Sequence, residues 1–453
     1  MRALHDADPT PPLETPPAPV SLKQAFWYWL KLGLISFGGP AGQIAIMHHD
    51  LVEQKRWISE KRFLHALNYC MVLPGPEAQQ LATYIGWLMH RTWGGIIAGV
   101  LFVLPSFFML VLLAWGYMAY GHMPTVAGAL YGIKPAVVAI VLFAAYRIGT
   151  RALKNRVMWA ISALAFVAIF LFKLPFPLIV LTAAGLGFLG ARLMPTYFTV
   201  GGHGAANQHF GRAMIDDDTP TPAHAKFSWQ GMVRVTLTGV ALWLLVMVGL
   251  YWQFGWQGAL THMGWFFSKA ALLTFGGAYA VLPYVYQGAV DHYHWLSATQ
   301  MMDGLALGET TPGPLIMVVT FVGFVGGWLN QALAAHGPLF AGFLAATVVT
   351  FFTFLPSFVF IFGGAPWIEN TRDNVRLTAP LSAITAAVVG VILNLALFFA
   401  YHVFLQSPWF AGVDWLAIGL AVMAWLALAR FKINVIAVIA AYALLGMLVQ
   451  WLR

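Results

Sequence analysis

Apolar segments follow one another with little between them from residue 25 to residue 451. Several of them, such as 95–120, 229–253 and 379–405, have about 20 residues or more, enough to cross about 30 Å of hydrocarbon. Only 9% of the residues are charged, whereas a soluble domain averages about 25%. Lipid is therefore the natural solvent for most of the surface. The sequence predicts an all-α polytopic membrane protein surrounded by a lipid bilayer.

Other apolar segments are too short to cross a bilayer and are bounded by glycine and proline, as at 62–73, 77–91 and 299–311. Half-helices and re-entrant segments are tolerated at membrane depth only where protein or a water-filled cavity surrounds them. We therefore expect broken helices that line a cavity.

Two polar stretches divide the chain. Residues 1–20 are rich in proline and predict a disordered cytoplasmic arm, while 194–228 contains glycines, prolines and three consecutive aspartates and predicts a polar linker. Residues 21–193 and 229–453 then form a first and a second half.

The two halves repeat each other. The recurring blocks keep one spacing, 274 − 36 = 238 residues. They are Ser36-Phe37-Gly38-Gly39 with Thr274-Phe275-Gly276-Gly277, Pro74-Gly75-Pro76 with Pro312-Gly313-Pro314, Trp57-Ile58-Ser59 with Trp295-Leu296-Ser297, and Lys31 with Lys269. A further block, Leu104-Pro105-Ser106-Phe107, recurs as Leu355-Pro356-Ser357-Phe358 at a spacing of 251, so the second half contains an insertion.

The charges beside the repeated tryptophans differ between the halves. Four basic residues surround Trp57, whereas Trp295 follows an aspartate and two histidines. The positive-inside rule places the first loop in the cytoplasm and the second outside. The sequence therefore predicts an inverted-topology repeat, an arrangement common in secondary transporters.

The broken segments predict an anion site. A helix that restarts at membrane depth presents unpaired N–H groups and a positive dipole end, both of which favour an anion. Glycine permits close approach of a ligand, and proline suits the first turn of the next helix. The expected substrate-binding residues are Gly38, Gly39, Pro40, Pro74, Gly75, Pro76, Gln79, Gly276, Gly277, Thr311, Pro312, Gly313 and Pro314. The alternative is that the glycines and prolines are ordinary loop turns or helix-packing positions.

Two lysines inside apolar runs complete the expected site. Lys31 and Lys269 each precede a Gly-Gly pair by seven residues. A basic residue inside a membrane segment costs free energy, so its presence there suggests a function. Two such cations would suit a dianion. We therefore expect Lys31→Gln and Lys269→Gln to abolish transport; the alternative is that both side chains extend to the interface.

Glu77 follows the first Pro-Gly-Pro, and Glu309 precedes the second by three residues. A carboxylate beside a helix N-terminus can serve as a cap, or it can carry the proton that couples transport. The two glutamates do not align at the repeat spacing, so a symmetric role is not expected.

Several other classes of function are disfavoured. The formal net charge of +8 arises from basic residues at the ends of apolar segments, which is the topology signal of a membrane protein and not a nucleic-acid-binding face. The sequence contains no GxxxxGK[ST], HExxH, paired CxxC or GxSxG motif. We predict no enzyme, no cofactor and no metal site.

At these motifs the chain resembles the chromate ion transporter family in its long, two-domain bacterial form. Residues 36–40 are similar to the family's opening signature, and 73–82 continuing to 84–87 are similar to its next block. Residues 274–277 and 311–316 resemble the second-half counterparts. The chain departs from strict symmetry at Ala278, which replaces the proline found at Pro40.

The resemblance implies a secondary transporter that exports chromate across the cell inner membrane and gives chromate resistance. It also implies sulfate as a related oxyanion and two fused halves of opposite orientation. A transporter of sulfate or another tetrahedral oxyanion remains an alternative, as does an uncoupled anion channel, and the sequence allows a homodimer.

Overall fold

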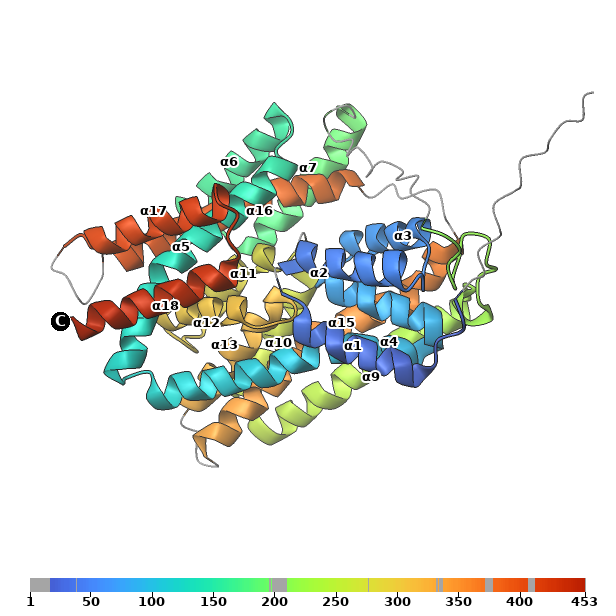
Figure 1. The fold of residues 1–453 in the computed structure, drawn as a ribbon, viewed down its shortest axis with the longest axis horizontal. Coiled ribbons are helices and arrows are strands. Elements are labelled where there is room, and N and C mark those ends of the chain that lie inside the picture. Colours follow the sequence, from blue (N-terminus) through green and yellow to red (C-terminus); the bar gives the residue numbers. More distant parts are fainter. Residues whose placement is uncertain are drawn as a thin grey trace, which may run out of the picture.

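The computed structural model describes residues 17–37, 39–194, 197, 210–275, 277–330, 333, 337–370, 378–405 and 412–452. The arrangement is helical (Figure 1). The first half contains α1 (Leu22–Ile35), α2 (Gly39–His48), the π-helix η1 (His49–Gln54), α3 (Glu60–Val72), α4 (Glu77–Tyr120), α5 (Pro124–Ala152), α6 (Arg156–Phe170) and α7 (Phe176–Leu193).

A short 3-10 helix, η2 (Ala223–Ala225), precedes the second half. That half contains α9 (Trp229–Phe254), α10 (Ala259–Leu273), α11 (Ala278–Tyr286), the π-helix η3 (Gln287–His292), α12 (Ala298–Thr310), η4 (Leu315–Met317), α13 (Val318–Leu329), α15 (Pro338–Asn370), α16 (Thr378–Phe404), α17 (Trp415–Ala429) and α18 (Val435–Trp451).

Membrane-spanning helices account for much of the described chain. Six of its helices are long and apolar enough to cross a bilayer, namely α4, α5, α7, α9, α15 and α16. Four shorter apolar helices accompany them. The predicted all-α, multi-pass membrane architecture is therefore confirmed.

The repeat is visible in the backbone as well as in the sequence. In each half a broken helix pair ends in a π-helix, η1 or η3, and the next long helix begins at a serine N-cap, Ser59 or Ser297. Arg56 and His294, which are 238 residues apart, both have positive φ, 51° and 52°. Equivalent strained positions at equivalent places show that the halves share one fold.

The helix α4 is a hairpin of two arms. Its backbone leaves helical geometry at His90 and Arg91. A Cβ built on Gly86 would lie 2.5 Å from the carbonyl oxygen of Gly94, so the arms 77–89 and 92–120 pack in close contact. In the second half α13 and α15 take the places of these two arms, and Gly327 approaches Ala341 in the same way.

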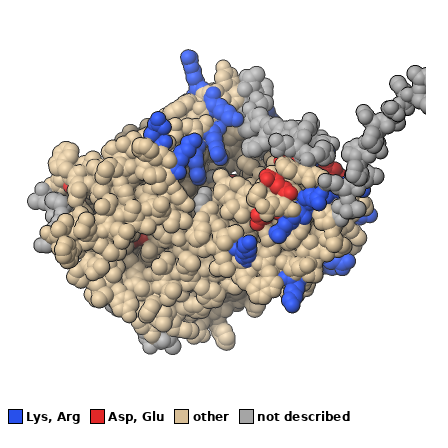
Figure 2. Space-filling view, in the orientation of Figure 1, with Lys and Arg blue, Asp and Glu red and all other residues tan. Residues whose placement is uncertain are grey.

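The second half contains one helix more than the first. The helix α9 precedes α10, whose counterpart in the first half is α1, and α9 itself has no counterpart there. The opposite orientation of the halves stays a prediction from the charges beside Trp57 and Trp295. In Figure 2 many of the visible lysines and arginines lie in the upper and right-hand parts of the view, and a few lie lower on the same face.

The halves interlock instead of lying as separate bodies. The second-half helix α16 packs on α6 and α7, and the first-half helix α5 packs on α17 and α18 (Figure 1). Between them α4 packs along α15. The broken helices are therefore surrounded by protein, as irregular backbone at membrane depth requires.

The described part of the linker, 210–228, is docked onto the first half. The backbone N–H of Ile215 donates to the Trp57 carbonyl at 3.0 Å, and Ser59 Oγ donates to the Asp217 carboxylate at 2.6 Å. His224 Nε2 lies 3.1 Å from the Trp87 carbonyl, and burial lowers the pKa of this histidine. The residues of the proposed arm before 17 lie outside the described residues.

Candidate functional site

The four helix breaks meet in the interior, and each break of one half pairs with a break of the other. The N–H of Gly75 donates to the Thr274 carbonyl at 2.7 Å, and the N–H of Gly313 donates to the Ser36 carbonyl at 2.7 Å. The two bonds are equivalent under exchange of the halves. The Pro-Gly-Pro turns and the Gly-Gly turns therefore form one structure with approximate twofold symmetry.

Four helix N-termini converge on the pocket between these breaks. The lining comes from the first residues of α2, α4, α11 and η4, together with the residues that precede them; it comprises Pro40, Gln43, Pro76, Glu77, Ala78, Gly277, Ala278, Pro314 and Leu315. The pocket encloses about 10 Å³, room for no more than one water. A tetrahedral oxyanion has four oxygen atoms and is larger, so the site is closed in this conformation.

Glycine is required at the breaks because of their backbone conformation. Gly39, Gly75, Gly277 and Gly313 have φ of 71°, 127°, 97° and 99°, a region that L side chains rarely adopt. At Gly75 and Gly313 space is short as well. A Cβ there would lie 2.7 Å from Ser357 Oγ and 2.8 Å from the Cβ of Ser106, respectively.

These two serines explain the repeated Leu-Pro-Ser-Phe motif. Ser106 belongs to the first half and packs on the Pro-Gly-Pro of the second, whereas Ser357 belongs to the second half and packs on that of the first. The sequence showed that the motif recurs but gave no partner for it. Its partner is the glycine of the opposite half.

Buried amide side chains surround the breaks. Gln43 donates from Nε2 to the carbonyls of Ser36 at 3.2 Å and Gly313 at 2.5 Å, and Gln80 donates to the Pro74 carbonyl at 2.8 Å. The Oε1 atoms of Gln43, Gln79 and Gln80 are buried without a hydrogen-bond partner. Buried polar groups without a partner are unfavourable, so these three amides are unusual in the protein interior.

Carboxylates and one arginine complete the surroundings. Glu77 lines the pocket directly. Glu309 accepts a hydrogen bond from the Tyr279 hydroxyl, and both lie within electrostatic range of Arg147 on α5. Arg147 also lies 4.0 Å from the Cβ position of Gly39. It is the cation nearest to a break among those described, and sequence reasoning missed it because it lies far from every motif.

The structure places the residues predicted from the sequence in different locations. Most of them lie in or directly behind the breaks: Gly39, Pro40, Pro74, Gly75, Pro76, Glu77, Gln79, Gly277, Glu309, Thr311, Pro312, Gly313 and Pro314. Gly38 and Gly276 lie outside the described residues. The Thr311 hydroxyl donates to the Gly308 carbonyl and is thereby occupied.

The two lysines are not brought to the pocket. Lys31 is exposed on the outer face of α1, and the buried residues of this helix are Ala25, Tyr28, Trp29, Leu32 and Gly33. The Nζ atom of Lys269 lies 5.6 Å above the ring of Trp265, which is itself exposed. In this conformation the positive potential at the pocket comes from helix N-termini, with no lysine in its lining.

The arrangement can hold a small anion, and it offers no reaction chemistry that we recognise. Within the described residues no group of three or more histidine, cysteine or acidic side chains is placed to hold a metal ion. The pocket contains no nucleophile paired with a base.

Comparisons with known proteins agree with this interpretation. The family model described as chromate transporter matches residues 23–188 and 261–447, one region in each half. The chain is 34% identical to the chromate transport protein of Pseudomonas aeruginosa over 96% of its own length and 94% of that protein. It is 31% identical to the chromate transport protein of Cupriavidus metallidurans over 86% of its length and 85% of that protein.

A probable chromate transport protein of Synechococcus elongatus is 28% identical over 82% of the chain and 83% of that protein. No solved structure matches the chain. The similarity covers both halves and includes all four breaks.

Proposed function

This chain belongs to the chromate transporter family, and from that premise we propose that it is a secondary transporter that exports chromate across the cell inner membrane and gives chromate resistance. The observation that supports this most strongly is the convergence of four helix N-termini on one closed pocket between the two halves. The identity of the substrate is inferred from the relatives that are named chromate transport proteins.

The electrostatics of the pocket suit a dianion. Each helix N-terminus carries about half of an elementary positive charge. Four of them together supply about two, which matches the charge of chromate or sulfate. Because helix dipoles and backbone N–H groups recognise charge and shape, both tetrahedral dianions are expected to bind, and selectivity between them is a matter for measurement.

The inverted halves provide a route for alternating access. Two equivalent hydrogen bonds, Gly75 N–H to Thr274 and Gly313 N–H to Ser36, join the breaks beside the pocket. We propose that one of these bonds opens while the other holds, so that the pocket is exposed to one side of the membrane at a time.

We propose the membrane potential as one source of energy, because the substrate is a dianion. Moving one elementary charge through a potential of 100 mV is worth about 2.3 kcal/mol. An inside-negative potential therefore favours the exit of a dianion by about 4.6 kcal/mol per 100 mV. Glu77 lies in the pocket itself, and its carboxylate would repel the anion unless it binds a proton, so we also propose that Glu77 couples transport to protons, with Glu309 as a second coupling carboxylate.

Chromate uptake into everted membrane vesicles tests the proposal. Vesicles with verified amounts of the protein should accumulate chromate saturably, an uncoupler should abolish the accumulation, and excess sulfate should compete. The variant Gln43→Glu, which adds negative charge to the pocket, should be inactive. Gln253→Glu on the exposed face of α9 makes the same chemical change far from the pocket and should behave as wild type.

Two results would contradict the proposal in different ways. If vesicles with verified protein accumulate no chromate, chromate export is excluded. The remaining hypothesis is then transport of sulfate or another oxyanion. Flux that neither saturates nor responds to the uncoupler would indicate an anion channel.

A further inference from the structure

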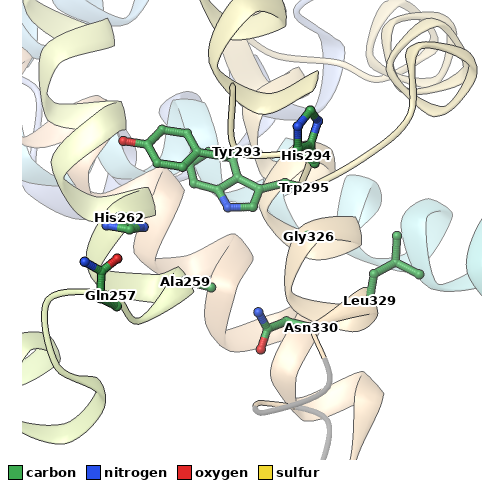
Figure 3. Close-up of a pocket in the computed structure, with 9 residues that line it drawn as sticks. All are labelled: Gln257, Ala259, His262, Tyr293, His294, Trp295, Gly326, Leu329 and Asn330. Carbon is green, nitrogen blue, oxygen red and sulfur yellow. The ribbon is translucent and has the colours of Figure 1, made fainter. Parts of the chain in front are cut away.

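A second pocket lies at the opposite end of α10 from the central site. It encloses about 270 Å³. Its wall contains Tyr293, His294 and Trp295 from the loop after η3, Gln257 and Ala259 at the start of α10, His262 one turn further, and Gly326, Leu329 and Asn330 at the end of α13 (Figure 3). The charges beside Trp295 predict, by the positive-inside rule, that this loop lies on the extracytoplasmic side.

The polar groups of this outer pocket include several hydrogen-bond donors. The indole N–H of Trp295 can only donate, and the side-chain amides of Gln257 and Asn330 each carry two N–H donors beside one carbonyl acceptor. Figure 3 shows the indole nitrogen of Trp295 on the edge that faces His262 and Asn330, while His294 projects away. No aspartate or glutamate is part of the lining; the neighbouring Asp291 lies outside it.

Trp295 is held rigidly by aromatic packing. Its ring stacks on Tyr293 with centroids 4.6 Å apart and planes 4° apart, and Phe267 covers the other side at 6.0 Å and 20°. Phe266 meets it edge-on at 5.6 Å. A side chain fixed in this way presents its N–H in one direction without loss of rotamer freedom on binding.

The linker lies over the equivalent edge of the first half. There the backbone of Arg56 and Trp57 accepts hydrogen bonds from Met214 and Ile215 of the linker at 2.9 and 3.0 Å. The linker thus covers the edge that corresponds to His294 and Trp295. The two equivalent loops therefore have different surroundings, and the repeat alone does not explain the outer pocket.

We infer that the outer pocket is a second oxyanion-binding subsite, which the tetrahedral dianion occupies on the extracytoplasmic side of the central site. This rests on the proposed function for the identity of the anion. The pocket is larger than the central one and open in the same conformation in which the central one is closed. The helix α10 begins in its wall and ends at Leu273, next to Thr274, whose carbonyl pairs with Gly75.

Equilibrium binding tests this inference independently of transport. The full-length protein in lipid nanodiscs is titrated with radiolabelled chromate. Trp295→Phe keeps the aromatic stack and removes only the N–H, so it should weaken binding about tenfold, as expected for a lost hydrogen bond to a charged group. Asn330→Asp places a negative charge in the pocket and should weaken binding at least as much.

Two further variants make the outcome decisive. Trp252→Phe, on a highly exposed tryptophan of α9 that is not part of the pocket, should bind as wild type. Gln43→Glu should lose transport through the central site but keep the outer binding. Equal binding by wild type, Trp295→Phe and Asn330→Asp would refute the subsite, and so would the absence of saturable binding to Gln43→Glu. Binding without accumulation in vesicles would instead refute the proposed transport and leave the subsite standing.

Discussion

A graded series of glycine-to-alanine variants probes whether the four breaks form one tightly paired structure. Gly313 has φ of 99° and its Cβ position lies 2.8 Å from the Cβ of Ser106. Gly277 has a similar φ of 97°, but nothing lies within 4 Å of its Cβ position. Gly249 in α9 likewise has open space around it, and it has helical geometry and an exposed position. The three positions therefore separate backbone strain from steric conflict.

The structure gives the order of the effects. Alanine at a positive φ of this kind costs about 1–3 kcal/mol, which is the whole expected destabilisation for Gly277→Ala. Gly313→Ala adds overpacking of about 1–3 kcal/mol, for a total of about 2–6 kcal/mol. Gly249→Ala should stabilise the protein by about 0.5–1 kcal/mol because alanine loses less backbone entropy in a helix.

The assay combines thermal unfolding of the purified protein in detergent with the initial rate of chromate accumulation in everted vesicles, normalised to the amount of protein. The melting temperature should fall in the order Gly249→Ala, wild type, Gly277→Ala, Gly313→Ala. A second-site change checks the cause: Ser106→Gly removes the atoms that the new methyl group would meet. The double variant Gly313→Ala/Ser106→Gly should recover about 1–3 kcal/mol relative to additive effects.

Equal melting temperatures for Gly313→Ala and Gly249→Ala would refute the close contact between Ser106 and the opposite Pro-Gly-Pro. Failure of Ser106→Gly to restore stability while Gly313→Ala is destabilised would show that the conflict lies elsewhere. In either case the reciprocal pairing of the halves would lose its main support.

Other predictions concern the charged groups. Glu77→Gln should abolish uncoupler-sensitive chromate accumulation yet preserve exchange of labelled for unlabelled anion, because the anion site remains while the proton carrier is lost; loss of exchange as well would make Glu77 part of anion binding. Arg147→Gln should lower the transport rate at least tenfold by leaving Glu309 without its nearby cation, and Arg147→Lys should restore part of it; unchanged rates would remove Arg147 from the mechanism. Lys31→Gln should transport at nearly the wild-type rate because the side chain is exposed, whereas loss of transport would support the role that the sequence suggested for it.

The fold could be predicted to a large extent because its signals are local and repeated. Low charge and long apolar segments determine the membrane class, and the Gly-Gly and Pro-Gly-Pro blocks mark the breaks by residues with unusual backbone freedom. The opposite orientation of the halves was predicted from the charges around Trp57, and the structure adds an extra helix, α9, at the start of the second half.

The interior of the site could not be predicted in the same way. The pairing of Gly75 with Thr274 and of Gly313 with Ser36 joins residues about 200 or more positions apart, and no local pattern encodes such a contact. Gln43 and Arg147 stand outside the repeated blocks, so no signal singled them out. The position of Lys31 was ambiguous because the exposed face of α1 also carries large apolar side chains, namely Phe26, Trp27 and Leu34, so hydrophobicity alone does not show which face is buried.

The location of bound chromate is the most direct test of the central claim, that the four helix N-termini form the oxyanion site. An experimental structure of the protein with chromate, with the metal located by its anomalous scattering, would provide it. We expect a chromium peak between Pro40, Glu77, Ala278 and Leu315, in a conformation where the pocket is wider than here. A peak beside Lys31 or Lys269, with none between the breaks, would contradict the proposed site and return the binding role to the lysines.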